Sequence, residues 1–321
     1  MTWSQLDPRA PGSGPPARGV PKPFGPGSLL WQHFDTRLAY LIGPAFGILQ
    51  NMYPALGAGV AEHSDVYDGP WSRLTRSLPE IVGSIYDGPG AAATAERIRR
   101  YHEPITGIDD RGRRYHALDP DTFFWAHATF VQAIYIGTDL LGTPLSTPQR
   151  HQLYAESIDW YTMYGLSMRP VPPDYDAFQA YWNYTCEHVL EATPAAKGIL
   201  AILDHLDEHP YPGVPKPLWR VAATAGRRPF QWLQHGVLPA PARARLGINW
   251  SKRDEVALRT LGAMGGKVWP HLPARVRLIT RAYNAKTRSR LHPAETESKP
   301  TSAGPGEQRP SLDNGEGPPA S

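Results

Sequence analysis

The chain contains one cysteine, Cys186, among its 321 residues. A single thiol excludes an internal disulfide and any zinc or iron–sulfur site built from several cysteines. The sequence also lacks the G-x-S-x-G nucleophile elbow, the G-x-x-x-x-G-K-[ST] phosphate loop and the H-E-x-x-H zinc motif. No Glu stands three residues before a His, which excludes the ferritin-like di-iron pattern. The usual hydrolase, nucleotide-binding and di-iron classes therefore have no support.

A long apolar run without interruption is missing as well. The longest uncharged stretch, Leu38 to Ala61, could span a bilayer by length, but Pro44 and Pro54 interrupt it. We predict two short buried helices there, with an interfacial or re-entrant segment as the alternative. Met1 to Pro26 has no apolar core, so we expect no signal peptide and a cytoplasmic location.

Proline and glycine, 35 and 30 residues, are abundant and concentrate at the two ends of the chain. Residues 1–28 and 292–321 hold too few apolar side chains to offset the loss of chain entropy on folding. We therefore expect two disordered tails that flank one folded domain over residues 29–291.

Helical signals dominate between the tails. Asp119 and Pro120 are typical of a helix start, and Phe124, His127, Val131 share one face at helical spacing over residues 123–141. The sequence predicts further helices over 91–101, 148–165, 172–191, 194–207, 216–225, 240–246, 251–264 and 272–289, and a short hairpin arm over 113–118. Long helices with short Pro- and Gly-containing loops indicate an all-α, single-domain bundle.

Charge is distributed unevenly along the chain. Residues 29–215 carry 12 Lys and Arg against 22 Asp and Glu, whereas residues 216–290 carry 16 against 2. This polarity indicates an anionic partner for the C-terminal part, or neutralisation by the acidic part of the same fold. Four Trp residues between 219 and 269 accompany the basic residues, as at membrane interfaces. We predict peripheral contact with an anionic membrane, and no nucleic acid, because no DNA- or RNA-binding motif is present.

The twelve histidines are the main candidates for chemistry. His127 lies in the middle of a predicted helix among aromatic residues, where its ring nitrogens need partners. The partner is either a backbone or carboxylate group or a metal, and spacing alone favours the first. His205 and His209 stand four residues apart beside acidic residues, which favours an exposed helix end over a metal site.

Three motifs, taken in order, resemble the family of rubber oxygenases (latex-clearing proteins) and MpaB-type oxygenases. They are R-x-x-H-x-x-x-x-G at Arg99–Gly107, L-D-P at Leu118–Pro120 and W-x-H-A-T at Trp125–Thr129. The resemblance covers about residues 29–290 and implies an all-α fold around one b-type haem. Rubber oxygenases carry Lys then Thr where this chain has His102 then Glu103. The chain is therefore more similar to the bacterial relatives of MpaB, and rubber itself is not an implied substrate.

The resemblance also implies roles for individual residues. His127 would be the proximal iron ligand, and Phe124 and Val131 would line the cofactor. Arg99 and His102 would lie on the distal side, where Arg99 orients O2 or a haem propionate and His102 serves as sixth ligand, donor or base. Glu103 could act as a base. His63 and His116 match the family pattern, and we expect only local capping from both.

The implied activity is a haem-dependent oxygenase that uses O2 on a carbon–carbon double bond. The substrate would be an apolar, prenylated type of small molecule. The alternative is a non-catalytic haem- or lipid-binding protein, which a sixth ligand from His102 would favour. The sequence does not indicate the oligomeric state.

Overall fold

The computed structural model describes residues 22–67, 69–141 and 143–291. Most of the predicted tails, residues 1–21 and 292–321, lie outside this part of the chain. Phe24, which the sequence analysis assigned to the N-terminal tail, packs in the core with 7% of its surface exposed. The packed chain therefore begins before residue 29.

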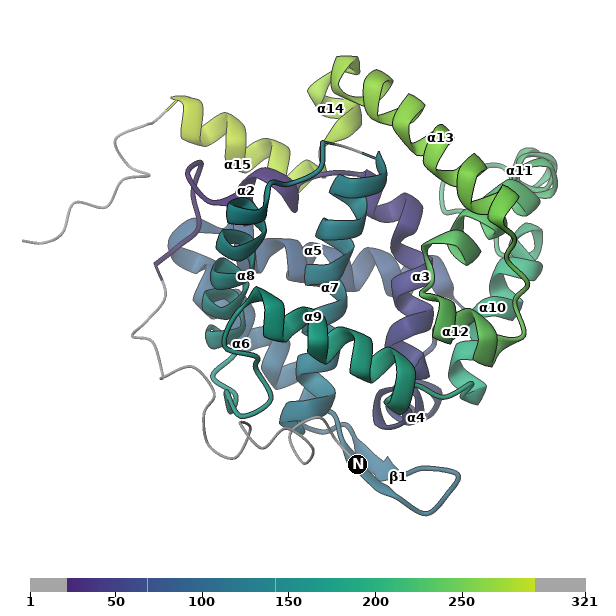
Figure 1. The fold of residues 1–321 in the computed structure, drawn as a ribbon, viewed down its shortest axis with the longest axis horizontal. Helices are drawn as coiled ribbons and strands as arrows, with labels where there is room; N and C mark the ends of the chain where they lie inside the picture. The colour runs from purple at the N-terminus through teal and green to yellow at the C-terminus, as the bar shows by residue number, and fades with distance from the viewer. Residues whose placement is uncertain (1–21, 68, 142, 292–321) are drawn as a thin grey trace, which may run out of the picture.

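The fold is all-α, as predicted (Figure 1). The only sheet in the described residues is a two-stranded antiparallel hairpin, β1 (Thr106–Ile108) and β2 (Arg114–His116). The α-helices are α2 (Leu29–His33), α3 (Leu38–Met52), α4 (Pro54–His63), α5 (Pro70–Tyr86), α6 (Ala91–His102), α7 (Pro120–Leu141), α8 (Thr147–Thr162), α9 (Tyr175–Tyr184), α10 (Pro194–Asp204), α11 (Lys216–Val237), α12 (Ala240–Leu246), α13 (Lys252–Val268), α14 (Ala274–Arg277) and α15 (Thr280–Leu291).

Side-chain caps and first-turn prolines set several helix starts. Thr193 accepts a hydrogen bond from the Ala196 N–H, and Ser251 forms a capping box with Asp254. Pro54 opens α4 immediately after the extended Tyr53, which divides the long uncharged stretch into two helices as predicted. No helix within the described ranges combines the length and apolar character that a membrane span requires.

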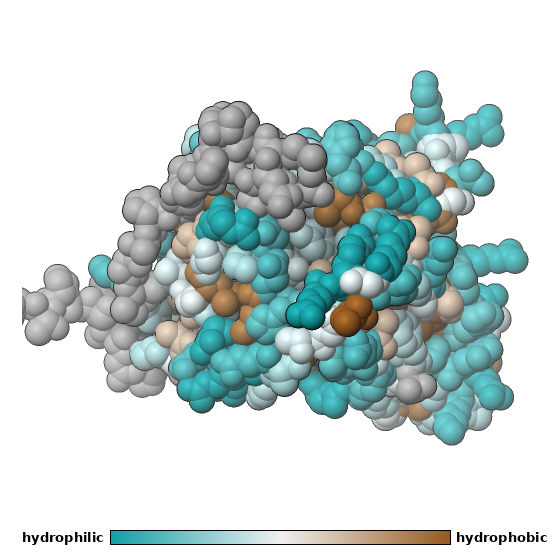
Figure 2. All heavy atoms as spheres, turned by 90° about the horizontal axis from the view of Figure 1, so that it is seen from below, coloured by the Kyte–Doolittle hydropathy of each residue, from teal (hydrophilic) through white to brown (hydrophobic). Residues whose placement is uncertain are grey.

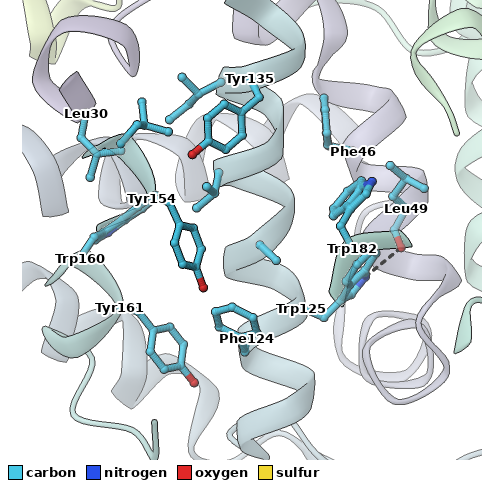
Figure 3. Packing of buried hydrophobic residues seen from close by; sticks show 14 of the residues in the cluster. Leu30, Phe46, Leu49, Phe124, Trp125, Tyr135, Tyr154, Trp160, Tyr161 and Trp182 are labelled. Carbon is cyan, nitrogen blue, oxygen red and sulfur yellow. Dashed lines mark hydrogen bonds between the residues drawn. The ribbon is translucent and has the colours of Figure 1, made fainter. Parts of the chain in front are cut away.

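The long helix α7 runs through the middle of the molecule, with α3, α8 and α9 around it (Figure 1). Its aromatic side chains are held from several directions. The Trp125 indole donates to the Leu49 carbonyl at 3.1 Å and stacks on Trp182 at 4.9 Å between ring centroids. On the other side, Trp160 of α8 donates to the Ser84 hydroxyl at 2.8 Å. Figure 3 shows α7 between these two groups of rings.

Proline and glycine account for the main differences from the predicted elements. Helix α5 was not predicted, because Pro79 breaks its pattern, yet the helix continues across it. Helix α11 extends past the predicted end at residue 225 and contains both Gly226 and Pro229. The predicted helix over 272–289 is two helices, α14 and α15, and α9 ends in a π-helical turn over Thr185–Val189.

Two ion pairs link the C-terminal helix α15 to the N-terminal part of the chain. Lys286 forms an ion pair with Asp35, and Arg281 forms one with Asp87. Both carboxylates are at least four-fifths buried, so each is a costly group to leave unpaired. The face from which the hairpin projects is mostly hydrophilic, with small hydrophobic areas (Figure 2).

Candidate functional site

His127 lies on α7 and is 4% exposed. Its Nε2–H donates to the main-chain carbonyl of Ser157 on α8, at 3.1 Å. A carbonyl can only accept, so this bond fixes the proton on Nε2 and leaves a lone pair on Nδ1. Among the described residues, Nδ1 is buried and has no hydrogen-bond partner. The imidazole therefore presents one unused lone pair, on Nδ1, to the protein interior.

Aromatic rings enclose this imidazole. The ring centroids of Trp160, Tyr161, Phe124 and Tyr164 lie 4.6, 5.2, 6.0 and 6.3 Å from that of His127. We call these four residues and Phe123 the aromatic cluster; Figure 3 shows its members Phe124, Trp160 and Tyr161 beside α7. Burial lowers the pKa of His127 to about 3, so the ring is neutral at physiological pH.

Tyr161, whose ring lies beside that of His127, carries a second unpaired polar atom. Its hydroxyl is buried and, like His127 Nδ1, makes no hydrogen bond in the described chain. Burial raises the pKa of Tyr161, so the hydroxyl keeps its proton. Buried polar atoms without partners are rare, because each costs about 1–3 kcal/mol of desolvation that nothing offsets. Two such atoms on neighbouring rings are candidate contacts for an additional group.

His102 adjoins the aromatic cluster from α6. Its Nδ1–H donates to the Ile98 carbonyl at 2.8 Å, which leaves the lone pair on Nε2. Its ring meets Phe123 at 5.6 Å between centroids, and Phe123 meets Tyr164 at 5.0 Å. Burial lowers the pKa of His102, and the nearby Arg73 adds to this effect. The two predicted histidines therefore reach one cluster from different helices, with aromatic rings between them.

The other predicted site residues are placed less centrally. Arg99 and Glu103 pair with each other at 2.9 Å, and their side chains are 31% and 49% exposed. Phe124 and Val131 are buried on α7, where Phe124 contacts His127 directly and Val131 lies one turn further along the helix. The structure thus brings His127, His102 and Phe124 to the cluster and leaves Arg99 and Glu103 paired at its periphery.

His63, His116 and His205 lie outside the aromatic cluster and make contacts of their own. His63 and His116 bond to the carbonyls of Thr106 and Glu103, each at 3.2 Å, which are 43 and 13 residues away, so they link separate segments and do not provide the local capping that was expected. His205 is exposed and lies 3.8 Å from Glu208. Within the described ranges, no group of three or more His, Cys, Asp or Glu could hold a metal ion. An iron bound at His127 would therefore need most of its ligands from a cofactor.

A cavity of about 620 Å³ lies elsewhere, between α4, the hairpin and the start of α10. None of the predicted site residues lines it. Its charged residues largely neutralise one another: Arg111 and Arg113 pair with Glu191, and Arg113 also pairs with Asp109. We therefore place the candidate site at the aromatic cluster, where the unpaired atoms are, and not at this cavity.

Sequence reasoning missed the contribution of α8. Ser157 and Tyr161 of α8 are four residues apart, a spacing that puts them on one side of the helix, and Tyr164 follows three residues later in the turn after α8. That pattern could have indicated a second aromatic wall facing His127. The partner of Nε2 is a main-chain carbonyl, for which a sequence holds no signal.

Comparison with known proteins gives one match. The family model described as "ER-bound oxygenase mpaB/B'/Rubber oxygenase, catalytic domain" matches residues 30–266. This range includes His102, His127 and the whole aromatic cluster, and it ends within α13. No curated protein and no solved structure matches the chain.

Proposed function

The chain belongs to the mpaB and rubber oxygenase catalytic-domain family, and from this membership we propose that it is a haem-dependent oxygenase. The family places it among oxidoreductases that use O2. Our proposal adds a b-type haem as the cofactor and an apolar, prenylated molecule as the substrate. The group attacked would be a carbon–carbon double bond of that substrate. The observation that carries it is the unpaired Nδ1 of His127 inside the aromatic cluster.

The residues around His127 fit a haem in their chemistry. His127 offers a neutral imidazole nitrogen, and its hydrogen bond to Ser157 fixes the ring as second partners of metal-bound histidines do. Phe124 and the other rings give the apolar walls that a porphyrin needs. These rings lie against the imidazole, so a macrocycle enters only when some of them move apart. Bound haem would supply an iron centre that binds and activates O2.

The chain's own groups would position the reactants. His102 keeps a lone pair on Nε2 at the other end of the cluster, where it can ligate a metal or accept a proton. The Tyr161 hydroxyl has a proton to donate and no present acceptor. Arg99 can orient an anionic group such as a propionate once it leaves Glu103, and Glu103 would then be free to accept a proton.

A non-catalytic haem- or lipid-binding protein is the second candidate. The lone pairs on His127 Nδ1 and His102 Nε2 both belong to rings that adjoin the aromatic cluster. Two imidazoles on one iron would leave no open position for O2, and the protein would then bind haem without turnover.

Isotope labelling tests the oxygenase. Haem-loaded protein is incubated with a long isoprenoid alkene under ¹⁸O2, and the products are analysed by mass spectrometry. Cleavage of one C=C bond by one O2 gives two carbonyl groups, so each product should carry one ¹⁸O. The alternative function holds if haem binds but neither O2 consumption nor labelled carbonyls appear. Cytoplasmic location, membrane contact, bacterial origin and the C-terminal domain boundary at residue 291 stay predictions.

A further inference from the structure

Helix α13 exposes four large aliphatic side chains. Val256, Leu261, Met264 and Val268 are 64, 57, 60 and 60% exposed. The helix lies along the outer edge of the molecule (Figure 1). On its inner side Leu258 and Gly262 are buried, and Gly262 passes so close to α7 that a Cβ there would be 2.3 Å from the Leu140 carbonyl. The inner side therefore fixes the helix, and the outer side is uncovered in the described chain.

The exposed residues form a continuous apolar stripe. Leu261, Met264 and Val268 follow one another at spacings of three and four residues, which places them on one side of the helix. Val256, eight residues before Met264, lies about 80° further round the helix and widens the apolar face toward the start of α13. Scattered exposed aliphatics are normal, but four on one outer helical face mark a contact surface. We call Val256, Leu261, Met264, Val268 and the cations among them the outer face of α13.

The cations on this face have no acidic partners. Lys252, Arg253 and Lys267 are exposed, and none pairs with a carboxylate of the described residues. Arg259 does pair with Glu255 at 2.8 Å. The two acidic residues of α13 also accept hydrogen bonds from tryptophan indoles, Asp254 from Trp232 and Glu255 from Trp250. The outer face is therefore both apolar and positively charged.

Neutralisation by the acidic part of the fold is incomplete. Among the 16 cations of residues 216–290, only Arg227, Arg281 and Lys286 reach carboxylates of the acidic part in the described chain. Three of the four tryptophans that suggested a membrane interface donate their indole N–H to groups of the protein instead. Trp219, like Trp232 and Trp250, is half-buried, and its indole donates to the Leu206 carbonyl. The exposed apolar component of this basic segment consists of the aliphatic residues of α13 together with Leu218 and Val221 of α11 and Val276 of α14.

We propose that the outer face of α13 docks on an anionic membrane surface. A second copy of the chain would bring the same cations face to face in a symmetric contact, which like-charge repulsion opposes. Nucleic acid would satisfy the cations but leave the four aliphatic chains exposed. An anionic bilayer satisfies both, because aliphatic side chains enter the interface while Lys and Arg reach the headgroups.

This docking deepens the proposed function, since it would bring the oxygenase to apolar substrates dissolved in lipid. The inner side of α13 packs on the C-terminal end of α7, the helix that carries His127. The binding itself needs no haem. A vesicle assay therefore reports on the surface alone, and haem content reports separately on the oxygenase.

Co-sedimentation of the full chain with vesicles of phosphatidylcholine, with and without phosphatidylglycerol, tests the proposal. We expect binding to the anionic vesicles at low salt, weakened at high salt, and little binding to neutral vesicles. The triple variant Lys252→Glu, Arg253→Glu, Lys267→Glu should bind on the order of a hundredfold more weakly, because each basic residue near an anionic surface contributes a factor of about five.

A matched pair of variants locates the contact. Leu261→Ser with Lys267→Glu changes one aliphatic and one unpaired cation on the outer face. Ile108→Ser with Arg114→Glu makes the same changes on the hairpin, at the bottom of Figure 1, where Ile108 is 62% exposed. Only the first variant should lose binding, and thermal unfolding should confirm that both are folded. Equal loss in both variants, or no binding of the folded wild type, would overturn the proposal. Binding of duplex DNA or self-association in place of vesicle binding would assign the face to another partner.

Discussion

Helices α7 and α8 use their large apolar residues in the opposite way to α13. Phe124 and Trp160 are fully enclosed and surround a neutral histidine, whereas Leu261 and Met264 point outward beside unpaired cations. The rings of the first region fill the space around His127. The outer face of the second region is not covered by any other part of the described chain. The first region is therefore an interior that holds a reactive group, and the second is a surface for contact with a partner outside the chain.

The comparison shows which features of a helix can be predicted from its apolar pattern. Helix α13 has two apolar sides, one with Leu258 and Gly262 and one with Leu261, Met264 and Val268. Both follow helical spacing, so periodicity predicts the helix but not which side is buried. In α13 the buried side is the one with glycine, because Gly262 permits the close approach to α7.

Truncation of a core ring should produce the largest loss of stability. Trp160→Ala removes a fully buried ring that contacts His127 and donates to Ser84, and it should lower the free energy of unfolding by about 3–5 kcal/mol. Met264→Ala on α13 should change it by less than about 0.5 kcal/mol, because that side chain is exposed. Urea unfolding of both variants measures the contrast. Similar losses would mean that α13 is covered by another part of the fold.

The ion pair between Lys286 and Asp35 joins α15 to the N-terminal part of the chain. Lys286→Met leaves a buried carboxylate without its partner and should cost about 3 kcal/mol of unfolding free energy. Adding Asp35→Asn should recover part of that loss, because it removes the stranded charge. Arg259→Met breaks the exposed pair with Glu255 and serves as the control, with an expected cost below about 0.5 kcal/mol. An equal cost for the two single variants would show that the Lys286 pair is not a structural link.

The buried histidine should make stability depend on pH. Burial lowers the pKa of His127 from 6.5 to about 3, so between these values the unfolded chain binds a proton that the folded chain does not. Stability should be complete above pH 6.5 and should fall on acidification, by about 2 kcal/mol between pH 7 and pH 5 from this group. His102 contributes in the same direction, since burial lowers its pKa too.

His127→Phe should flatten this pH dependence in the haem-free protein. His205→Phe, at an exposed position, is the matched control and should leave the slope unchanged. Unfolding free energies at several pH values give the answer. An unchanged slope in His127→Phe would show that the ring titrates in the folded chain.

The smallest effect is expected at the periphery of the site. Glu103→Ala breaks the exposed pair with Arg99 and should lower the free energy of unfolding by less than about 0.5 kcal/mol. Chemical denaturation measures it. A loss of several kcal/mol would place this pair in the interior and not at the edge of the cluster.

Much of the fold could be predicted, because caps and first-turn prolines are local signals. Pro54 divides one apolar stretch into α3 and α4, and Ser251 opens α13. The failures came from proline as well: Pro79 and Pro229 stand inside helices that tertiary packing holds together. The length of such a helix depends on what packs against it, which local sequence does not record.

The candidate site could be predicted only in part. His127 could be identified from its aromatic neighbours and from the family resemblance. The i,i+4 spacing of Arg99 and Glu103 is also visible in the sequence. The Ser157 carbonyl and the unpaired Tyr161 hydroxyl depend on how α8 packs against α7. His127 and Ser157 are thirty residues apart in the sequence, so their contact can be known only from the folded structure.

The haem content of purified protein, measured from the absorption spectrum, tests the central claim most directly. Wild-type protein supplied with haem should bind one haem per chain through His127. His127→Ala should keep its helical circular-dichroism spectrum and lose the haem band, whereas His205→Ala should keep both. A wild type that binds no haem, or a His127→Ala variant that keeps the full band, would contradict the account.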